Sequence, residues 1–147
     1  MEIIRVNNDN EWVNSGIDRE GFVDFLFTHL GQFGDPKEDI NNCINYAFKM
    51  NGGLGGFCLV VKDDGKVVGG LIMNHTGMAK YIPANILVYV AVDGNQRGKG
   101  IGKKLCQDAV ENVDGDVALH VEYDNPAKRL YERLGFTSKY AEMRFKK

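Results

Sequence analysis

Two stretches in the first third of the chain place apolar residues at helical spacing. The first spans residues 18–30 and is closed by Gly31, and the second begins after Pro36 and stops at Asn51-Gly52-Gly53. Apolar positions that recur every three or four residues gather on one side of a helix, so each stretch predicts an amphipathic helix. The weaker alternation of residues 1–6 predicts a short strand ahead of them.

The middle of the chain has the pattern of β-structure. Residues 57–62 and 67–73 are rich in β-forming side chains and flank the turn Asp63-Asp64-Gly65-Lys66. An Asp-Gly pair between two such runs predicts a β-hairpin. Residues 86–92 are apolar throughout, which is typical of a central strand buried on both faces.

The spacing of apolar residues changes repeatedly along the last part of the chain. Residues 100–113 follow helical spacing, whereas residues 117–123 have the pattern of a strand. Asn125-Pro126 then predicts the start of another helix, because Asn favours the N-cap and Pro the first helical position, and Gly135 closes it. Residues 138–145 predict a final strand. The elements together predict a mixed α/β fold, with a central mixed sheet flanked by about four helices.

The composition fits one folded domain over residues 1–147 and argues against other classes of protein. Hydrophobic residues make up 44% and charged residues 26%, enough for a packed core and a solvated surface. The longest apolar run has seven residues, far short of the ~20 of a membrane helix, and the N-terminus lacks the pattern of a secretory leader. The three cysteines are odd in number and widely spaced, which predicts no disulfide framework and a cytoplasmic location. His, Cys, Asp and Glu are not clustered at metal-ligand spacing, so the sequence predicts no metal site.

Charge is distributed unevenly along the chain. Residues 1–60 contain four Lys and Arg against nine Asp and Glu, whereas residues 94–147 contain eleven against eight. This pattern favours an anionic ligand near the C-terminal half and a cationic one near the N-terminal half, for which Asp35, Glu38 and Asp39 are candidates. Acids at a helix start also stabilise the helix dipole, and two ordinary solvated surfaces would look the same. No basic run long enough to predict nucleic-acid binding is present.

The most informative segment is the glycine-rich turn over residues 92–104. An apolar strand leads into glycines at 98, 100 and 102, and a helix follows. Such glycines let the backbone approach a ligand closely, and the helix N-terminus adds partial positive charge, so the turn predicts an anion site of phosphate type. The spacing excludes a P-loop, which would need Gly at position 97 and Ser or Thr after Lys103, whereas this chain has Arg97 and Lys104. It also excludes the dinucleotide-binding motif G-x-G-x-x-G, whose third glycine would fall on Lys103.

The spacing that does fit is R-x-x-G-x-G, formed by Arg97-Gly98-Lys99-Gly100-Ile101-Gly102. It resembles the acetyl-CoA motif of the GCN5-related N-acetyltransferase (GNAT) family. A second segment, residues 125–136, is similar to the family's N-x-A-x-x-L-Y-E-x-L-G-F signature. The two motifs occur in the family's order, separated by one helix and one strand. The resemblance covers roughly residues 86–136, and the N-terminal half agrees only in the order of its elements.

The resemblance implies a GNAT-like acyl-CoA N-acyltransferase fold that moves an acetyl group from acetyl-CoA to a primary amine. Residues 1–56 would supply the acceptor-side helices and residues 57–147 the acetyl-CoA-binding core. The pantetheine arm would lie in a V-shaped opening between the strands ending at Val92 and Tyr123, paired with the backbone of Val90, Ala91 and Val92. The pyrophosphate would bind the amides of Arg97, Gly98, Lys99, Gly100, Ile101 and Gly102. Asn125 is the next expected CoA contact, although Asp124 matches the family's spacing to the tyrosine better.

By the same resemblance, Tyr131 is the general acid that protonates the departing thiolate; by helical spacing alone it would be a core residue. The general base is left open. Alternation over residues 117–123 puts His120 and Glu122 on one face, and His120 has a reference pKa of ~6.5. Glu122 or a water relay are the alternatives. A non-catalytic acyl-CoA-binding domain would share the fold, and a homodimer is compatible with the family.

Overall fold

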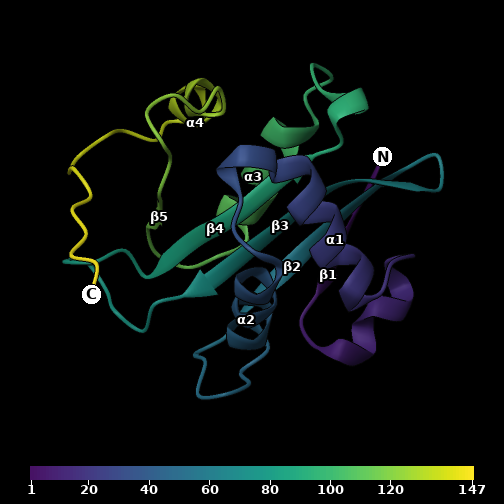
Figure 1. Cartoon of the computed structure of the whole chain (residues 1–147), viewed down its shortest axis with the longest axis horizontal. Coiled ribbons are helices and arrows are strands. Elements are labelled where there is room, and N and C mark those ends of the chain that lie inside the picture. Colours follow the sequence, from purple (N-terminus) through teal and green to yellow (C-terminus); the bar gives the residue numbers. More distant parts are fainter.

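The computed structural model describes residues 1–147 as a five-stranded mixed sheet with helices on both faces (Figure 1). Strands β1 (Glu2–Val6), β2 (Gly56–Asp63), β3 (Lys66–His75) and β4 (Asn85–Val92) are antiparallel neighbours in sequence order. The fifth strand, β5 (Val117–Leu119), pairs with β4 in parallel. The mixed α/β fold predicted from the sequence is confirmed.

Two hydrophobic clusters, one on each face, attach the helices to the sheet. Helices α1 (Arg19–Leu30) and α2 (Lys37–Ala47) pack with Cys58 and Val60 of β2 on one face. Helix α3 (Ile101–Glu111) packs with Phe57, Leu59 and Val61 on the other, where α4 (Lys128–Arg133) contributes Tyr131. The alternation along β2 divides its side chains between the clusters. No helix in the chain is both long enough and apolar enough to cross a bilayer.

The boundaries of the predicted elements follow from local chemistry. The side chain of Asp18 accepts the N–H of Gly21 at 2.7 Å and caps α1, which ends at Gly31 with a φ of 57°. The β2–β3 hairpin turns at Asp64 and Gly65, whose φ values of 51° and 77° are both left-handed. This is the backbone that an Asp-Gly pair adopts most readily in a two-residue hairpin. Short 3₁₀ helices, which the sequence did not predict, cover Asp9–Asn14, Gly31–Phe33 and Gly94–Gln96.

Three predictions for the C-terminal third need correction. The strand expected over residues 117–123 ends at Leu119, because β4 and β5 pair at only three positions. The strand expected over residues 138–145 is absent; this segment leaves α4 as an exposed tail at the edge of the molecule (Figure 1). Alternation alone does not make a strand when no neighbouring strand supplies hydrogen bonds. Helix α4 begins at Lys128, and Pro126 lies in the turn before it.

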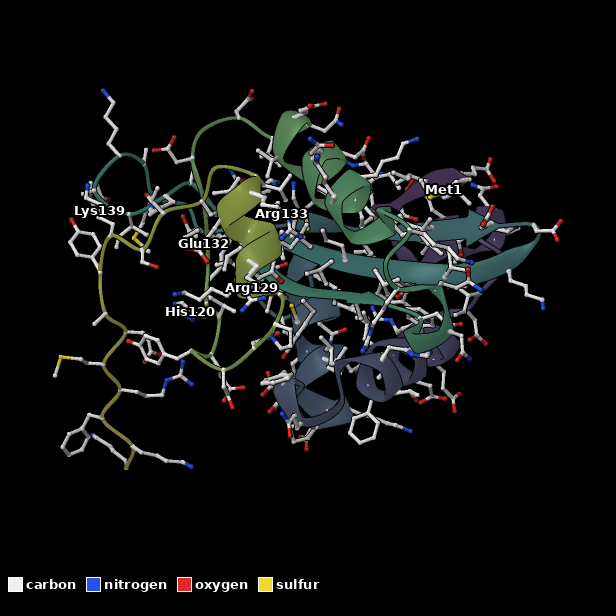
Figure 2. The ribbon with its side chains drawn as sticks, turned by 90° about the horizontal axis from the view of Figure 1, so that it is seen from above. Met1, His120, Arg129, Glu132, Arg133 and Lys139 are labelled. Atoms are coloured by element: carbon white, nitrogen blue, oxygen red, sulfur yellow. The ribbon has the colours of Figure 1, made fainter.

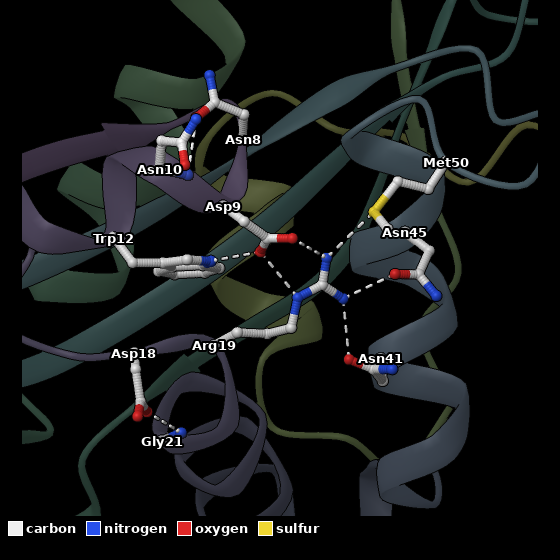
Figure 3. A network of polar contacts seen from close by, with 10 residues as sticks. All are labelled: Asn8, Asp9, Asn10, Trp12, Asp18, Arg19, Gly21, Asn41, Asn45 and Met50. Carbon is white, nitrogen blue, oxygen red and sulfur yellow. Dashed lines mark hydrogen bonds and ion pairs between the residues drawn. The ribbon is translucent and has the colours of Figure 1, made fainter.

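A cluster of hydrogen-bonded polar side chains joins α1, α2 and the first 3₁₀ helix (Figure 3). The guanidinium of Arg19 on α1 donates to both carboxylate oxygens of Asp9, at 2.9 and 3.2 Å. It also donates to the side-chain oxygens of Asn41 and Asn45 on α2, at 2.9 and 2.8 Å. Arg19 therefore fixes α1 against α2 and against the 3₁₀ helix that contains Asp9.

We expect Arg19→Ala to lower the free energy of unfolding by about 2 kcal/mol, because it removes charge-assisted hydrogen bonds to three partners. Urea denaturation measures the loss, and Arg144→Ala is the control, since Arg144 pairs only with Glu142 in the exposed tail. The hydrogen bond from Arg19 lowers the pKa of Asp9. The contribution is therefore present above the unfolded carboxyl pKa of about 3.9 and is lost as pH falls through the lowered one. Equal losses in the two variants would contradict a structural role for this cluster.

Candidate active site

Strands β4 and β5 separate after a short stretch of pairing. Strand β4 pairs with β5 at Asn85, Ile86 and Leu87 and has no partner on that side from Val88 to Val92. The backbone of the predicted pantetheine contacts, Val90, Ala91 and Val92, therefore lies on this free edge. An unpaired strand edge offers its N–H and C=O groups to an extended ligand, which can add to it as a further strand.

A β-bulge marks the start of the free edge. In the pairing of β3 with β4, Met73 is opposite Leu87 and Ile72 is opposite Tyr89, so Val88 is the extra residue. A bulge changes which face the following side chains point to. Leu87 accordingly belongs to the cluster under α3, whereas Tyr89 and Ala91 belong to the cluster under α1 and α2.

The glycine turn joins the end of β4 to α3 with its backbone amides free. Gly98 and Gly100 have φ values of 81° and 78°, a left-handed conformation that favours glycine. Helix α3 has no side-chain cap. From Arg97 to Lys103, no backbone N–H donates to another group of the protein. Together with the partial positive charge of the helix N-terminus, these donors form a cradle for an anion of phosphate type.

Residues outside the motif hold this turn in place. The imidazole Nδ1 of His29, at the end of α1, accepts the N–H of Gly94 at 3.2 Å, and the backbone oxygen of His29 accepts from Nη2 of Arg97 at 2.9 Å. A Cβ on Gly102 would lie 3.3 Å from Cδ2 of Leu130 and 3.5 Å from Cγ2 of Val92, so Gly102 brings α3 close to α4 and β4. The sequence did not indicate His29, because its contacts join residues 65 or more apart.

Helix α4 places Tyr131 in the cluster under α3. Its side chain is 8% exposed, and its ring meets that of Phe136 edge-on with centroids 6.0 Å apart. Burial raises the pKa of the Tyr131 phenol, so the hydroxyl keeps its proton at neutral pH. That hydroxyl makes no hydrogen bond within the protein, and it is not fully buried. The Oδ1 atom of Asn125 accepts the N–H of Ala127 at 2.9 Å, which turns the chain into α4.

The two predicted base candidates do not share a strand face. His120 and Glu122 lie beyond the end of β5, on the exposed segment that leads to α4. Figure 2 shows His120 on this segment, with Arg129, Glu132 and Arg133 on the helix that follows. The expected alternation fails here because the strand has already ended. Neither side chain has a hydrogen-bond partner in the protein that would orient it as a base.

The acidic residues of the N-terminal half separate into two groups. Glu38 and Asp39 lie in the first turn of α2, where they stabilise the helix dipole. Asp35 precedes the helix, and its Oδ2 accepts the hydroxyl of Tyr89 at 2.5 Å. Tyr89 was not among the predicted site residues, because an apolar run gives no sign of a bulge that turns one of its side chains.

Comparisons with known proteins point to one family. The family model described as acetyltransferase (GNAT) domain matches residues 55–138. A comparison with curated proteins gave no match. The fold is similar to that of a ribosomal-protein-alanine N-acetyltransferase from Brucella melitensis biovar Abortus 2308, with a TM-score of 0.62, 16% identity and 99% of each chain covered.

Two aminoglycoside N-acetyltransferases have the same fold. AAC(6')-Iy, solved in complex with CoA, has a TM-score of 0.67 and 15% identity, over 99% of this chain and 93% of its own. AAC(6')-IG from Acinetobacter haemolyticus has a TM-score of 0.66 and 13% identity, over 100% of this chain and 98% of its own. At these identities the similarity establishes the fold alone.

Proposed function

Because the chain belongs to the acetyltransferase (GNAT) family, and its class of reaction is therefore acyl transfer, we propose that it moves the acetyl group of acetyl-CoA to a primary amine. The observation that carries the proposal is the row of free N–H groups over residues 97–103, directly after the free edge of β4. These two features suit the two parts of one ligand: an extended amide-containing arm and a pyrophosphate.

In this proposal the pantetheine arm pairs with the backbone of Val90, Ala91 and Val92, and the pyrophosphate binds the amides from Arg97 to Gly102. The fit is supported by the open space at Gly98 and Gly100, where a Cβ would meet no atom within 4 Å, so a ligand can approach the backbone. Lys103 and Lys104 are exposed at the start of α3 and add positive charge near the phosphates.

The chemistry is direct attack of a neutral amine on the thioester carbonyl. A bond forms between nitrogen and the acetyl carbon, the carbon–sulfur bond breaks, and the CoA thiolate leaves. Tyr131 would donate its phenolic proton to that thiolate and recover a proton from solvent. The proton lost by the amine would pass to His120, to Glu122 or through water.

Release of CoA thiol, measured in the presence of a panel of primary amines, tests the function. We expect amine-dependent release and one acetylated amine per thiol. N,N-dimethylbutylamine is the matched control for 1-aminobutane, because a tertiary amine has no N–H to lose and forms no stable amide. Tight binding of CoA without release by any primary amine would contradict the proposal and support the non-catalytic acyl-CoA-binding alternative.

A further inference from the structure

A carboxylate outside the cofactor cradle is held against the free part of β4. Asp35 lies exposed in the loop before α2, and its Oδ2 accepts the hydroxyl of Tyr89 at 2.5 Å. Tyr89 itself is 8% exposed. Burial, and next the contact with Asp35, raise the pKa of the Tyr89 phenol, so Tyr89 remains the donor and Asp35 the acceptor. One oxygen of the carboxylate is fixed, and the other is available.

The bulge at Val88 decides where this carboxylate lies relative to the proposed reaction. Tyr89 adjoins Val90, the first residue of the proposed pantetheine contact, and its side chain projects toward α1 and α2. Tyr131, the proposed acid, lies in the cluster on the opposite face of the sheet. Asp35 is therefore linked through Tyr89 to the face of β4 that packs under α1 and α2.

The charge of Asp35 is not matched by any cation of the protein. Asp35 takes part in no salt bridge, and the nearest lysine in sequence, Lys37, pairs instead with Asp24 on α1 at 2.9 Å. An exposed carboxylate with one oxygen held by a buried phenol is preorganised for a cationic group, because the phenol restricts its rotamers before the ligand arrives.

A second unsatisfied polar atom lies on the same face. Asn74 on β3 is 8% exposed; its Nδ2 contacts Sγ of Cys43 at 3.3 Å, and its Oδ1 is buried without a partner. Burial raises the pKa of the Cys43 thiol to about 12, and the hydrogen bond from Asn74 offsets part of that rise. A buried amide oxygen without a partner is costly.

Tyr89, which holds Asp35, faces α1 and α2, whereas Tyr131, the proposed acid, lies on the opposite face of the sheet. The carboxylate is therefore placed for a part of the acceptor other than the amine that reacts. We infer that Asp35, held by Tyr89, binds a second cationic group of the acceptor, so that the substrate class is a diamine or another amine carrying a second positive charge. This inference rests on the proposed acetyl transfer.

The test compares kcat/KM for 1,4-diaminobutane and 1-aminobutane, which differ only in the second amino group. We expect the wild-type protein to prefer the diamine by about tenfold or more, well above the factor of two that arises from its two equivalent amines. In Asp35→Asn the ratio should fall toward two, mainly through KM of the diamine. Tyr89→Phe should give an intermediate ratio, because the carboxylate remains but loses its anchor.

Glu20→Gln is the charge-matched control, since Glu20 lies exposed in the first turn of α1 and makes no contact with Tyr89; it should keep the wild-type ratio. A wild-type ratio near two, or an Asp35→Asn ratio equal to that of wild type, would overturn the diamine site while leaving acetyl transfer intact. Absence of thiol release with every primary amine would overturn the proposed function and this site with it.

Discussion

Gly100→Asp is expected to weaken CoA binding by about 100-fold or more, measured by calorimetry. The new carboxylate would lie at the N-cap of α3, among the free amides from Arg97 to Lys103. An acid at this position accepts helix N–H groups itself, so it would compete with the pyrophosphate for the same donors and repel it electrostatically. Asp also tolerates the left-handed backbone of position 100 better than most residues, so the fold should survive.

Gly65→Asp separates the effect on binding from backbone strain. Gly65 has a φ of 77°, close to the 78° of Gly100, and a Cβ at either position would meet no atom within 4 Å. The hairpin turn at Gly65 has no part in the proposed site, so this variant should bind CoA like wild type. Gly100→Asn, which adds a side chain of the same size without charge, should bind with intermediate affinity. Unchanged affinity in a folded Gly100→Asp variant would show that the glycine turn does not bind the phosphates.

The helices and the first four strands were predictable because each has its own local signal. Helices α1 and α2 each repeat apolar residues at helical spacing, and the β2–β3 hairpin carries Asp-Gly at its turn. The glycine turn was predictable for a related reason: its conformation is set by residues within the turn, chiefly Gly98 and Gly100. Periodicity and turn chemistry operate over a few residues, so a single sequence reveals them.

The features that the sequence did not reveal depend on residues far apart. Whether residues 120–123 and 138–145 form strands depends on a neighbouring strand, which alternation cannot indicate. The bulge at Val88 lies within residues 86–92, which are apolar throughout. The sequence pattern therefore does not mark the residue after which the side chains point to the other face of the sheet. The contact of Asp35 with Tyr89 joins positions 54 residues apart, and only the folded chain brings them together.

Tyr131→Phe is expected to lower kcat by about 10²–10⁴-fold, the usual effect of removing one general acid. The substitution keeps the ring that packs against Phe136 and removes only a hydroxyl that makes no hydrogen bond within the protein. Stability and CoA affinity should therefore stay close to wild type, which thermal unfolding and calorimetry would check. A core residue would behave in the opposite way, with a change in stability and little change in turnover.

The pH dependence of kcat provides an independent test of the same role. A general acid acts in its protonated form, so its contribution is lost as pH rises through its pKa. Burial raises the pKa of Tyr131 above the ordinary value of 10.0, so the wild-type protein should show no alkaline loss from this group up to pH 10. Tyr140→Phe, in the exposed tail, is the matched control and should leave kcat unchanged. A kcat for Tyr131→Phe within about twofold of wild type would assign Tyr131 to the core and require another donor, such as water, for the thiolate.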